Sequence, residues 1–286
     1  MKKTVLGSVP ILLALGAVAV WGLGSEPQES LPVIAPEEIA ESSLAPAEPV
    51  RFIEIVGGCG PYFEGTCVNV RSGPGTEFPS VAKLRDGIVL RVATSTAHSE
   101  DGTVWYQIIF DEWLRYPGRV QGDWYVASSF ARAVDAAGPE ELDPLATNPL
   151  AQAGALLGHT TTEKRIVVDR SEQMLYAYEG TKLVLETPIS TGLDLTPTPR
   201  GIFTIYRKTP TRYMQGPLPG ISDQYYDLPG VPWNLYFTKE GGAIHGAYWH
   251  EEFGQQWSHG CVNLPLDIAR TLYEWAPLGT QVLVQD

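Results

Sequence analysis

The stretch SHGCVN at residues 258–263, with IHG upstream at residues 244–246, decides how this sequence is interpreted. Cys261 follows a histidine and a glycine, and His245 lies sixteen residues before it. A cysteine becomes a nucleophile when a base or a positive field favours its thiolate. A neighbouring histidine can lower the thiol pKa from about 8.5 to about 3.5–7.5. The pattern therefore predicts Cys261 as a nucleophile and His245, at the end of an expected strand, as its general base.

The other residues of the 258–263 stretch are expected to support this nucleophile. Glycine permits a close turn, so the backbone N–H groups of Gly260 and Cys261 are expected to bind the oxyanion of an acyl-transfer reaction. Ser258 and Asn263 are expected to hold the loop through hydrogen bonds to backbone. His259 lies two residues before Cys261, and alternate residues of an extended segment have parallel side chains. Its ring would therefore not turn onto the Cys261 sulfur, and His259 is expected to line the pocket instead.

Two other interpretations of these residues stay open. An isolated cysteine is often a small buried hydrophobe, and an isolated histidine is often a core or surface residue. A zinc site could be built from His245, His250, His259 and Cys261. Metal-binding thiols usually come in pairs at short spacing, so the sequence favours catalysis with no metal and no other cofactor.

Around these motifs the sequence resembles the L,D-transpeptidase catalytic domain family, whose members carry a histidine, a spacer and then Ser/Thr-His-Gly-Cys-x-Asn. The resemblance runs from about Arg165 to Val284 and includes TPTPRGIF at residues 196–203. It implies that Cys261 attacks the third-residue carbonyl of a peptidoglycan tetrapeptide stem, releases D-alanine and passes the acyl group to an amine of another stem. Peptidoglycan stem peptides would then be the partners of this protein.

Three alternatives to this activity remain at this point. Water as the acceptor would make the same site an L,D-carboxypeptidase, and a cysteine hydrolase of wall peptides would use the same nucleophile. A protein of another class, a non-catalytic cell-wall-binding protein, would carry a degenerate site. The intact stretch 258–263 favours an enzyme.

Five further side chains are expected to line the substrate pocket. They are Arg200, Tyr236, Tyr248, Trp249 and His250. The segment around His250 is expected to be a lid or pocket wall, because binding residues often lie on loops. A structural role is an equal alternative for Arg200 and Tyr236, and a solvated loop position is one for His250.

Residues 51–134 show short strand-like runs separated by turn sequences. The runs are residues 51–56, 67–70, 88–93, 104–110 and 124–126, and they suggest a small barrel. The stretch VNVRSGPGT at residues 68–76, with WY at 105–106 and 124–125, resembles a bacterial SH3-like domain. This resemblance implies a module that binds a cell-wall ligand or acts as a spacer. Trp105 and Trp124 are expected to fill its core.

Residues 164–286 are expected to form a mostly β domain. Strands are predicted at 166–168, 174–178, 183–189, 202–206, 235–237, 243–245 and 281–284. After the nucleophile, Pro265 and Asp267 open a helix that Pro277 stops. The expected fold class is therefore mainly β: a small SH3-like barrel, then a mostly β catalytic domain with one clear helix after Cys261.

The acidic charge of the protein is concentrated in two segments. Of the formal net charge of −13, residues 25–50 carry −6 and residues 135–163 carry −5. Such segments repel themselves and stay solvated, so 25–50 is predicted as a Pro/Glu-rich linker and 135–163 as an acidic linker. The flanking regions are close to neutral and offer no basic stripe, which makes a nucleic-acid partner unexpected.

Residues 1–24 are predicted to be a signal peptide or a membrane anchor. Lys2 and Lys3 precede an apolar run, which is typical of export. The run continues past AVA at residues 17–19, and about 20 apolar residues suffice to span a bilayer. The protein is therefore expected in the cell envelope, either anchored in the membrane through this segment or secreted.

Three cysteines are an odd number for an exported protein. An oxidising compartment could join Cys59 to Cys67 and leave Cys261 free. Spacing alone does not decide that bond, because it depends on the geometry of the two side chains.

Overall fold

The computed structural model describes residues 51–110, 114–142, 163–220 and 222–286. These described residues belong to one compact unit. The predicted anchor, the first linker and most of the acidic linker lie outside the described residues. In the described ranges, no helix is long and apolar enough to cross a membrane.

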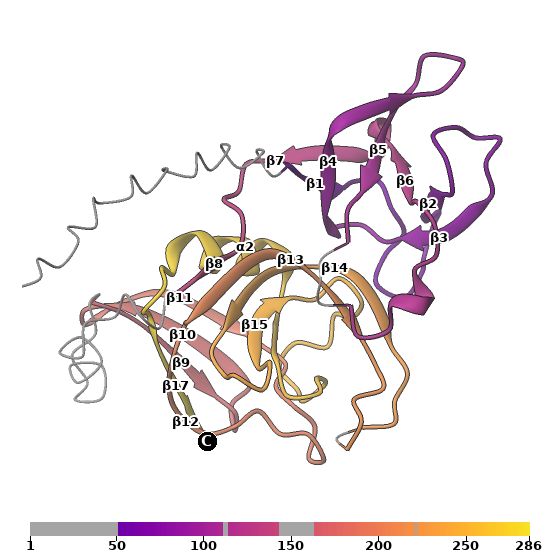
Figure 1. Cartoon of the computed structure of the whole chain (residues 1–286). Coiled ribbons are helices and arrows are strands. Elements are labelled where there is room, and N and C mark those ends of the chain that lie inside the picture. Colours follow the sequence, from indigo (N-terminus) through magenta and orange to yellow (C-terminus); the bar gives the residue numbers. More distant parts are fainter. Residues whose placement is uncertain (1–50, 111–113, 143–162, 221) are drawn as a thin grey trace, which may run out of the picture. The chain divides into compact units, whose positions relative to one another are not determined.

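The first part of the chain forms one sheet of seven antiparallel strands (Figure 1). Its strands are β1 (Arg51–Ile55), β2 (Val68–Arg71), β3 (Ser80–Leu84), β4 (Val89–His98), β5 (Val104–Ile108), β6 (Tyr125–Ala127) and β7 (Ala131–Val134), in the order β3-β2-β6-β5-β4-β1-β7. Two short 3-10 turns, η1 (Pro117–Arg119) and η2 (Ser128–Phe130), flank β6. Trp105 and Trp124 are buried, in agreement with a core role. The SH3-like assignment of this sheet stays a prediction.

Strands β3 and β7 were not predicted from the sequence. Most residues of β3 are exposed or half-buried, and in β7 only Val134 is buried. Neither strand therefore shows the alternation of apolar and polar residues that identifies a half-buried strand. Each is held by backbone pairing to a neighbouring strand with more buried residues, β3 to β2 and β7 to β1.

The rest of the described chain forms two five-stranded sheets and a helix. One sheet contains β9 (Lys164–Asp169), β10 (Met174–Glu179), β11 (Lys182–Pro188), β12 (Gly201–Thr204) and β17 (Gln281–Gln285), in the order β11-β10-β9-β17-β12. The other contains β8 (Glu140–Glu141), β13 (Arg207–Gln215), β14 (Asp227–Tyr236), β15 (Ala243–Gly246) and β16 (Val262–Leu264), in the order β16-β15-β14-β13-β8. Side chains from both sheets and from the helix share one hydrophobic core.

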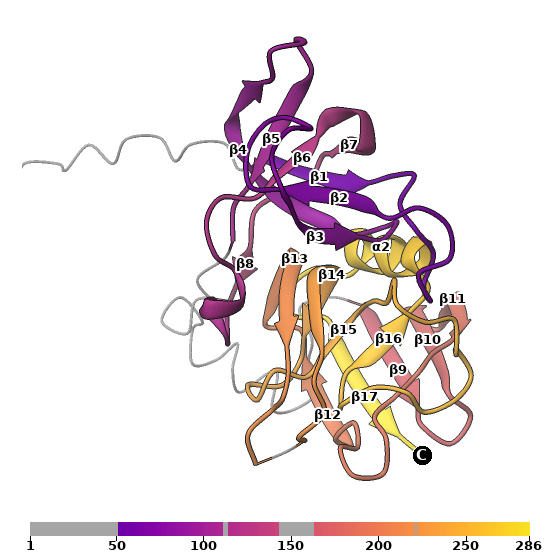
Figure 2. The same ribbon diagram turned by 90° about the vertical axis from the view of Figure 1, so that its right-hand side faces the viewer.

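The helix after the nucleophile is confirmed as α2 (Leu266–Trp275). It follows Pro265, ends before Pro277 and buries Ala269, Leu272 and Tyr273 on one face. This face packs into the core shared by the two sheets, and Figure 2 shows the helix at one end of them. The mainly β fold class is confirmed.

Three strands of the second sheet escaped prediction for physical reasons. Strand β13 reads RKTPTRYMQ, yet it is largely buried, and its Lys208 donates from Nζ to Tyr273 O at 2.8 Å. The predicted strand 235–237 overlaps only the end of β14. The earlier part of β14 contains Pro229, Gly230 and Pro232, which are uncommon inside strands, so the sequence did not indicate a strand there. Strand β8 lies within the predicted acidic linker and pairs with basic residues of β13. Strand β16 is only three residues long.

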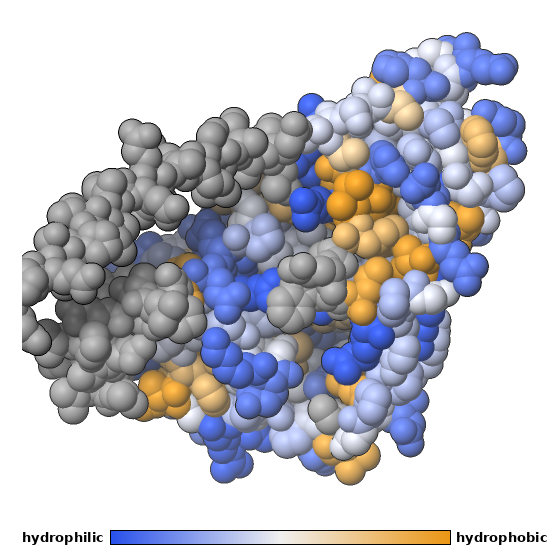
Figure 3. Space-filling view, in the orientation of Figure 1, coloured by the Kyte–Doolittle hydropathy of each residue, from blue (hydrophilic) through white to orange (hydrophobic). Residues whose placement is uncertain are grey.

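The seven-stranded sheet and the rest of the chain share buried side chains. Val231 and Tyr248 pack with the core of the first sheet, and Phe52, Val89 and Val134 pack with the core of the other two. Most of the face drawn in Figure 3 is hydrophilic, with apolar residues gathered in a few groups.

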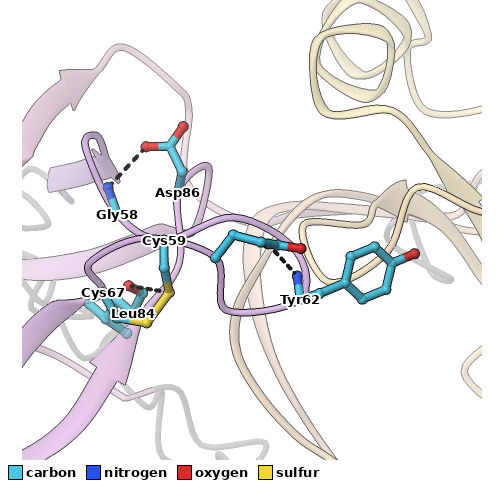
Figure 4. Close-up of a disulfide and its surroundings, with 7 residues drawn as sticks. Gly58, Cys59, Tyr62, Cys67, Leu84 and Asp86 are labelled. Atoms are coloured by element: carbon cyan, nitrogen blue, oxygen red, sulfur yellow. Dashed lines mark hydrogen bonds between the residues drawn. A yellow bond between two sulfur atoms is a disulfide. The ribbon is translucent and has the colours of Figure 1, made fainter.

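Cys59 and Cys67 form a disulfide with an S–S distance of 2.06 Å (Figure 4). The bond leaves Cys261 as the free cysteine of the described residues. The possibility that the sequence left open is thereby settled in favour of the pairing.

Candidate active site

Parallel pairing of β15 with β16 brings the two sequence motifs together. His245 in β15 is paired with Asn263 in β16, and Cys261 lies two residues before Asn263. Cys261 directly precedes Val262, the strand partner of Ile244, and its thiol lies near the Ala243 N–H. The pairing therefore places Cys261 beside the strand that carries His245, although the two residues are sixteen positions apart in the sequence.

Two hydroxyl groups fix the backbone at Cys261. Ser258 Oγ donates to Cys261 O at 2.5 Å, and Thr198 Oγ1 donates to the same oxygen at 3.2 Å. Ser258 Oγ also accepts the Gly260 N–H at 3.1 Å. The φ of Gly260 is 113°, in the region that favours glycine. In this conformation the Gly260 N–H, one of the two expected oxyanion donors, is already hydrogen-bonded.

A tight turn after β11 delivers Thr198 to this loop. The Gly192 N–H donates to Thr198 Oγ1 at 2.9 Å. A Cβ atom at Gly192 would lie 2.1 Å from Thr196 O, which no side chain tolerates. Glycine at this position therefore allows residues 192–198 to fold back against the loop that carries Cys261.

The Cys261 thiol is held in its neutral form at neutral pH. The residue is partly exposed, and its sulfur lies 3.9 Å from Gly241 O. Burial of the thiol raises its pKa above the ordinary value of 9.0, and only the Ala243 N–H opposes that shift. The expectation of a lowered thiol pKa is not met, because the effect of burial exceeds that of the Ala243 N–H.

His245 is buried, its imidazole is neutral, and its hydrogen bond selects one of the two tautomers. Its side chain is 2% exposed and its Nδ1 lies 3.0 Å from Gly246 O. A carbonyl oxygen only accepts, so Nδ1 carries the hydrogen and the lone pair is on Nε2. Burial lowers the pKa of His245 to about 4. At neutral pH the ring can therefore accept a proton at Nε2, which is what a general base requires.

His250 is a second buried histidine beside this pair. Its Nδ1 accepts the Glu252 N–H at 3.1 Å, so in the neutral ring the hydrogen is on Nε2. Nε2 lies 2.9 Å from Asn263 Nδ2, while Asn263 Oδ1 is buried without a partner. Exchanging the amide oxygen and nitrogen of Asn263 satisfies both groups, because Oδ1 then accepts the Nε2–H.

The two buried histidines make the stability of the fold sensitive to acid. Burial lowers the pKa of each from 6.5 to about 4, aided in His250 by the nearby His245. Between these pH values the unfolded chain takes up protons that the folded chain does not, so the free energy of unfolding falls as pH drops below 6.5. We expect a loss of about 2 kcal/mol from His245 alone by pH 5.

Urea unfolding at pH 7.0 and pH 5.0 measures this loss. The variant His250→Gln should reduce the difference between the two pH values, whereas His98→Gln, at an exposed position, should leave it unchanged. A free energy of unfolding that stays constant or rises towards pH 5.0 would contradict the prediction.

His259 is directed into a groove of about 630 Å³. The segment 193–196 and residues 220 and 222–224 also line this groove. His259 Nε2 lies 2.6 Å from Gln224 Oε1, and its ring lies 5.4 Å from that of Tyr226. The structure thus places His259 in the wall of this groove, with its ring hydrogen-bonded to Gln224.

The five expected pocket residues separate into two groups. Trp249 lies with its ring 5.8 Å from His245 and 5.9 Å from His250, so these two join the site. Arg200 instead forms an ion pair with Asp286. Tyr236 and Tyr248 are likewise engaged elsewhere: Tyr236 lies against Tyr206 with ring centroids 6.4 Å apart, and the buried Tyr248 donates to Pro229 O at 2.7 Å. In the described part of the chain, none of the five lines the groove at His259.

Sequence reasoning missed Tyr226 and Thr198. Burial and then the charge of Cys261 raise the pKa of Tyr226 to about 12, which places its phenol near the thiol. No motif marks Tyr226, because it reaches the site through the fold of the segment before β14. Thr198 lies in the TPTP run at residues 196–199, and that run was a usable signal.

The zinc alternative required a cluster of histidine and cysteine ligands. Among the residues for which the structure gives positions, no three side chains of His, Cys, Asp or Glu gather to hold a metal ion. The rings of His245 and His259 are engaged with Gly246 O and the Gln224 side chain.

Comparison with known proteins identifies relatives of this part of the chain. Residues 163–284 match the L,D-transpeptidase catalytic domain family. "Probable L,D-transpeptidase YbiS" of Escherichia coli K12 is 34% identical over 137 residues, which are 43% of this chain and 44% of that protein. "Putative L,D-transpeptidase YkuD" of Bacillus licheniformis is 30% identical over 127 residues, 43% of this chain and 67% of that protein.

A solved relative is the catalytic domain of an L,D-transpeptidase from Enterococcus faecium, 31% identical with a TM-score of 0.38. The match covers 43% of this chain and 98% of that domain. The chain spans about 44% of the length of YbiS. From the match over residues 163–284 and the relative in Bacillus licheniformis, the chain belongs to the L,D-transpeptidase catalytic domain family.

Proposed function

We propose that the protein is a peptidoglycan L,D-transpeptidase with Cys261 as nucleophile and His245 as general base. The observation that supports this proposal is the parallel pairing of β15 with β16, since a free thiol directly precedes β16 and a neutral, buried imidazole lies in β15. The substrate would be the tetrapeptide stem of peptidoglycan, on which the family acts.

The protonation states of the two groups define the first step. The thiol is neutral because burial raises its pKa, and the imidazole is neutral because burial lowers its pKa. His245 Nε2 takes the proton from Sγ as the sulfur attacks the carbonyl of the third stem residue. The tetrahedral oxyanion is bound by the Cys261 N–H, since the Gly260 N–H is engaged with Ser258 in the resting loop.

The second half of the reaction returns the proton. The tetrahedral intermediate expels the D-alanine amine, which receives the proton from His245 and leaves a thioester on Cys261. An amine of another stem attacks the thioester and gives its proton to His245. The peptide bond forms, the sulfur leaves and recovers the proton.

Three groups support these steps without touching the reacting atoms. Ser258 and Thr198 hold the Cys261 carbonyl and thereby the direction of its N–H. The side chains of Asn263 and His250 are hydrogen-bonded to each other, and Asn263 is the strand partner of His245. The groove at His259 and the nearby Tyr226 would bind the stem peptide. Rigid support of this kind keeps catalytic groups within the small tolerance that chemistry allows.

Water as acceptor would make the same site a carboxypeptidase or a wall-peptide hydrolase, with every step up to the thioester unchanged. The remaining parts fit an envelope enzyme: residues 1–24 would export or anchor it, 25–50 and 135–163 would act as linkers, and 51–134 would be a bacterial SH3-like domain that contacts the cell wall. A non-catalytic wall-binding protein would not need a free cysteine beside a buried base.

Product analysis tests the proposal and separates the acceptors. The full chain is incubated with a disaccharide tetrapeptide, and the products are followed by mass spectrometry. A cross-linked dimer that has lost one D-alanine supports transpeptidation. A tripeptide without dimer indicates hydrolysis, and an unchanged substrate with no mass added to Cys261 would refute an acyl enzyme.

A further inference from the structure

The disulfide of the seven-stranded sheet closes a short loop, residues 59–67, that exposes two aromatic side chains. Cys59 is buried, whereas Tyr62 is 50% exposed and Phe63 is 58% exposed. The loop is braced from within: Gly60 N–H donates to Glu64 O at 2.9 Å, and Phe63 N–H donates to Gly60 O at 3.0 Å. Figure 4 shows the Tyr62 side chain pointing away from the disulfide.

Tyr62 reaches the segment 248–253, which carries His250. Its hydroxyl donates to Glu252 Oε1 at 2.9 Å and accepts the Glu251 N–H at 3.3 Å. These contacts join residues about 190 positions apart in the sequence. A hydrogen bond to a carboxylate is among the stronger kinds, so this pair can hold one segment against the other.

Arg85 adds a second contact between the same two segments. Its guanidinium carbon lies 3.9 Å from the centroid of the Phe63 ring and 5.7 Å from that of Tyr248. Both distances fall within the range of a cation–π contact. The loop 59–67 therefore touches the segment 248–253 through two independent groups, Tyr62 and the Phe63–Arg85 pair.

From Glu252 the contacts continue to the nucleophile strand. Glu252 N–H donates to His250 Nδ1, Glu252 O accepts Ser190 Oγ at 2.6 Å, and His250 Nε2 meets the Asn263 side chain. Ser190 exchanges two backbone hydrogen bonds with Asn263, at 2.9 and 3.1 Å. Asn263 is the strand partner of His245 and lies two residues after Cys261. The hydrogen bonds from Glu252 to Asn263 have ordinary lengths, and the last step to His245 and Cys261 runs through strand pairing and the chain itself.

We propose that Tyr62, presented by the disulfide-closed loop 59–67, is a positioning residue of the active site that acts through Glu252, His250 and Asn263. The seven-stranded sheet is then part of the catalytic unit, and the Cys59–Cys67 bond keeps Tyr62 in place. The expected change in kcat rests on the proposed transpeptidase function. The expected change at His250 rests on the geometry alone.

The variant Tyr62→Phe removes the hydroxyl and keeps the ring. We expect kcat for acyl transfer to fall roughly three- to tenfold, the size of one hydrogen bond, with little change in KM. The ¹⁵N signals of His250, which in the intact protein should report hydrogen on Nε2, are expected to shift or broaden. Tyr125→Phe, at a partly exposed tyrosine of the same sheet, should change neither quantity.

A double-mutant cycle with Glu252→Ala distinguishes a relay from two separate effects. If Tyr62 acts through Glu252, the double variant should lose no more activity than Glu252→Ala alone. The double variant Cys59→Ser with Cys67→Ser should resemble Tyr62→Phe in kcat and in the His250 signals. Should this double variant not fold, as circular dichroism would show, Tyr62→Phe decides the matter.

Unchanged kcat and unchanged His250 signals in Tyr62→Phe would overturn the inference, as would full additivity in the cycle. The rate of Cys261 alkylation by iodoacetamide is measured in parallel, because it reports the nucleophile without any wall substrate. If wild-type protein shows no acyl transfer, the proposed function fails. The His250 signals and the alkylation rates still test the positioning role in that case, because neither measurement needs a wall substrate.

Discussion

Replacing Cys261 with alanine is expected to abolish acyl transfer and to leave the fold intact. In the proposed mechanism the sulfur forms the covalent bond to the substrate, and none of the remaining side chains described at the site could replace it. Removal of a catalytic nucleophile costs a factor of about 10⁶ in a well-studied hydrolase triad, so the residual rate should be at the background of the assay. The loop should survive, because Ser258 and Thr198 bind the backbone oxygen of this residue and not its sulfur.

The measurement is cross-link formation from a disaccharide tetrapeptide, with circular dichroism and the thermal midpoint as checks on the fold. Wild-type protein alkylated at Cys261 is the matched control, since it retains every other side chain and the Cys59–Cys67 bond. Full transfer activity in Cys261→Ala would remove the enzymatic interpretation altogether.

Replacing His245 with alanine is expected to lower kcat by about 10²–10⁴, the usual contribution of a general base. The loss should be large because burial raises the pKa of the Cys261 thiol, so little thiolate exists at neutral pH without a base. The double variant with Cys261→Ala should lose little more than Cys261→Ala alone, because the proposed mechanism has the two groups act as one unit.

Two further histidines serve as comparisons for the base. His259→Gln should reduce activity much less than His245→Ala, because its ring is engaged with Gln224 in the groove wall. His250→Gln should act through position, with a loss smaller than that of His245→Ala. A near-normal rate in His245→Ala together with a large loss in either of the others would assign the base to that other histidine.

Local patterns were sufficient for much of the architecture. The apolar alternation in β2 and the Pro-bounded run of α2 are local features of the chain, and both elements form within a residue or two of their predicted bounds. Strands β3, β13 and β16 lack such patterns. They form because neighbouring strands supply backbone hydrogen bonds and buried contacts, which cannot be recognised from the local residue pattern.

The sequence by itself determined the nucleophile motif, the family resemblance, the mainly β class and the helix after Cys261, because each depends on residues close together in the chain. Only the tertiary structure decided that Cys261 rests as a thiol, that His245 is neutral with its lone pair on Nε2, and that Tyr62 reaches Glu252. A pKa depends on the burial and charges around a group. Those surroundings come from segments far apart in sequence, so no local pattern contains them.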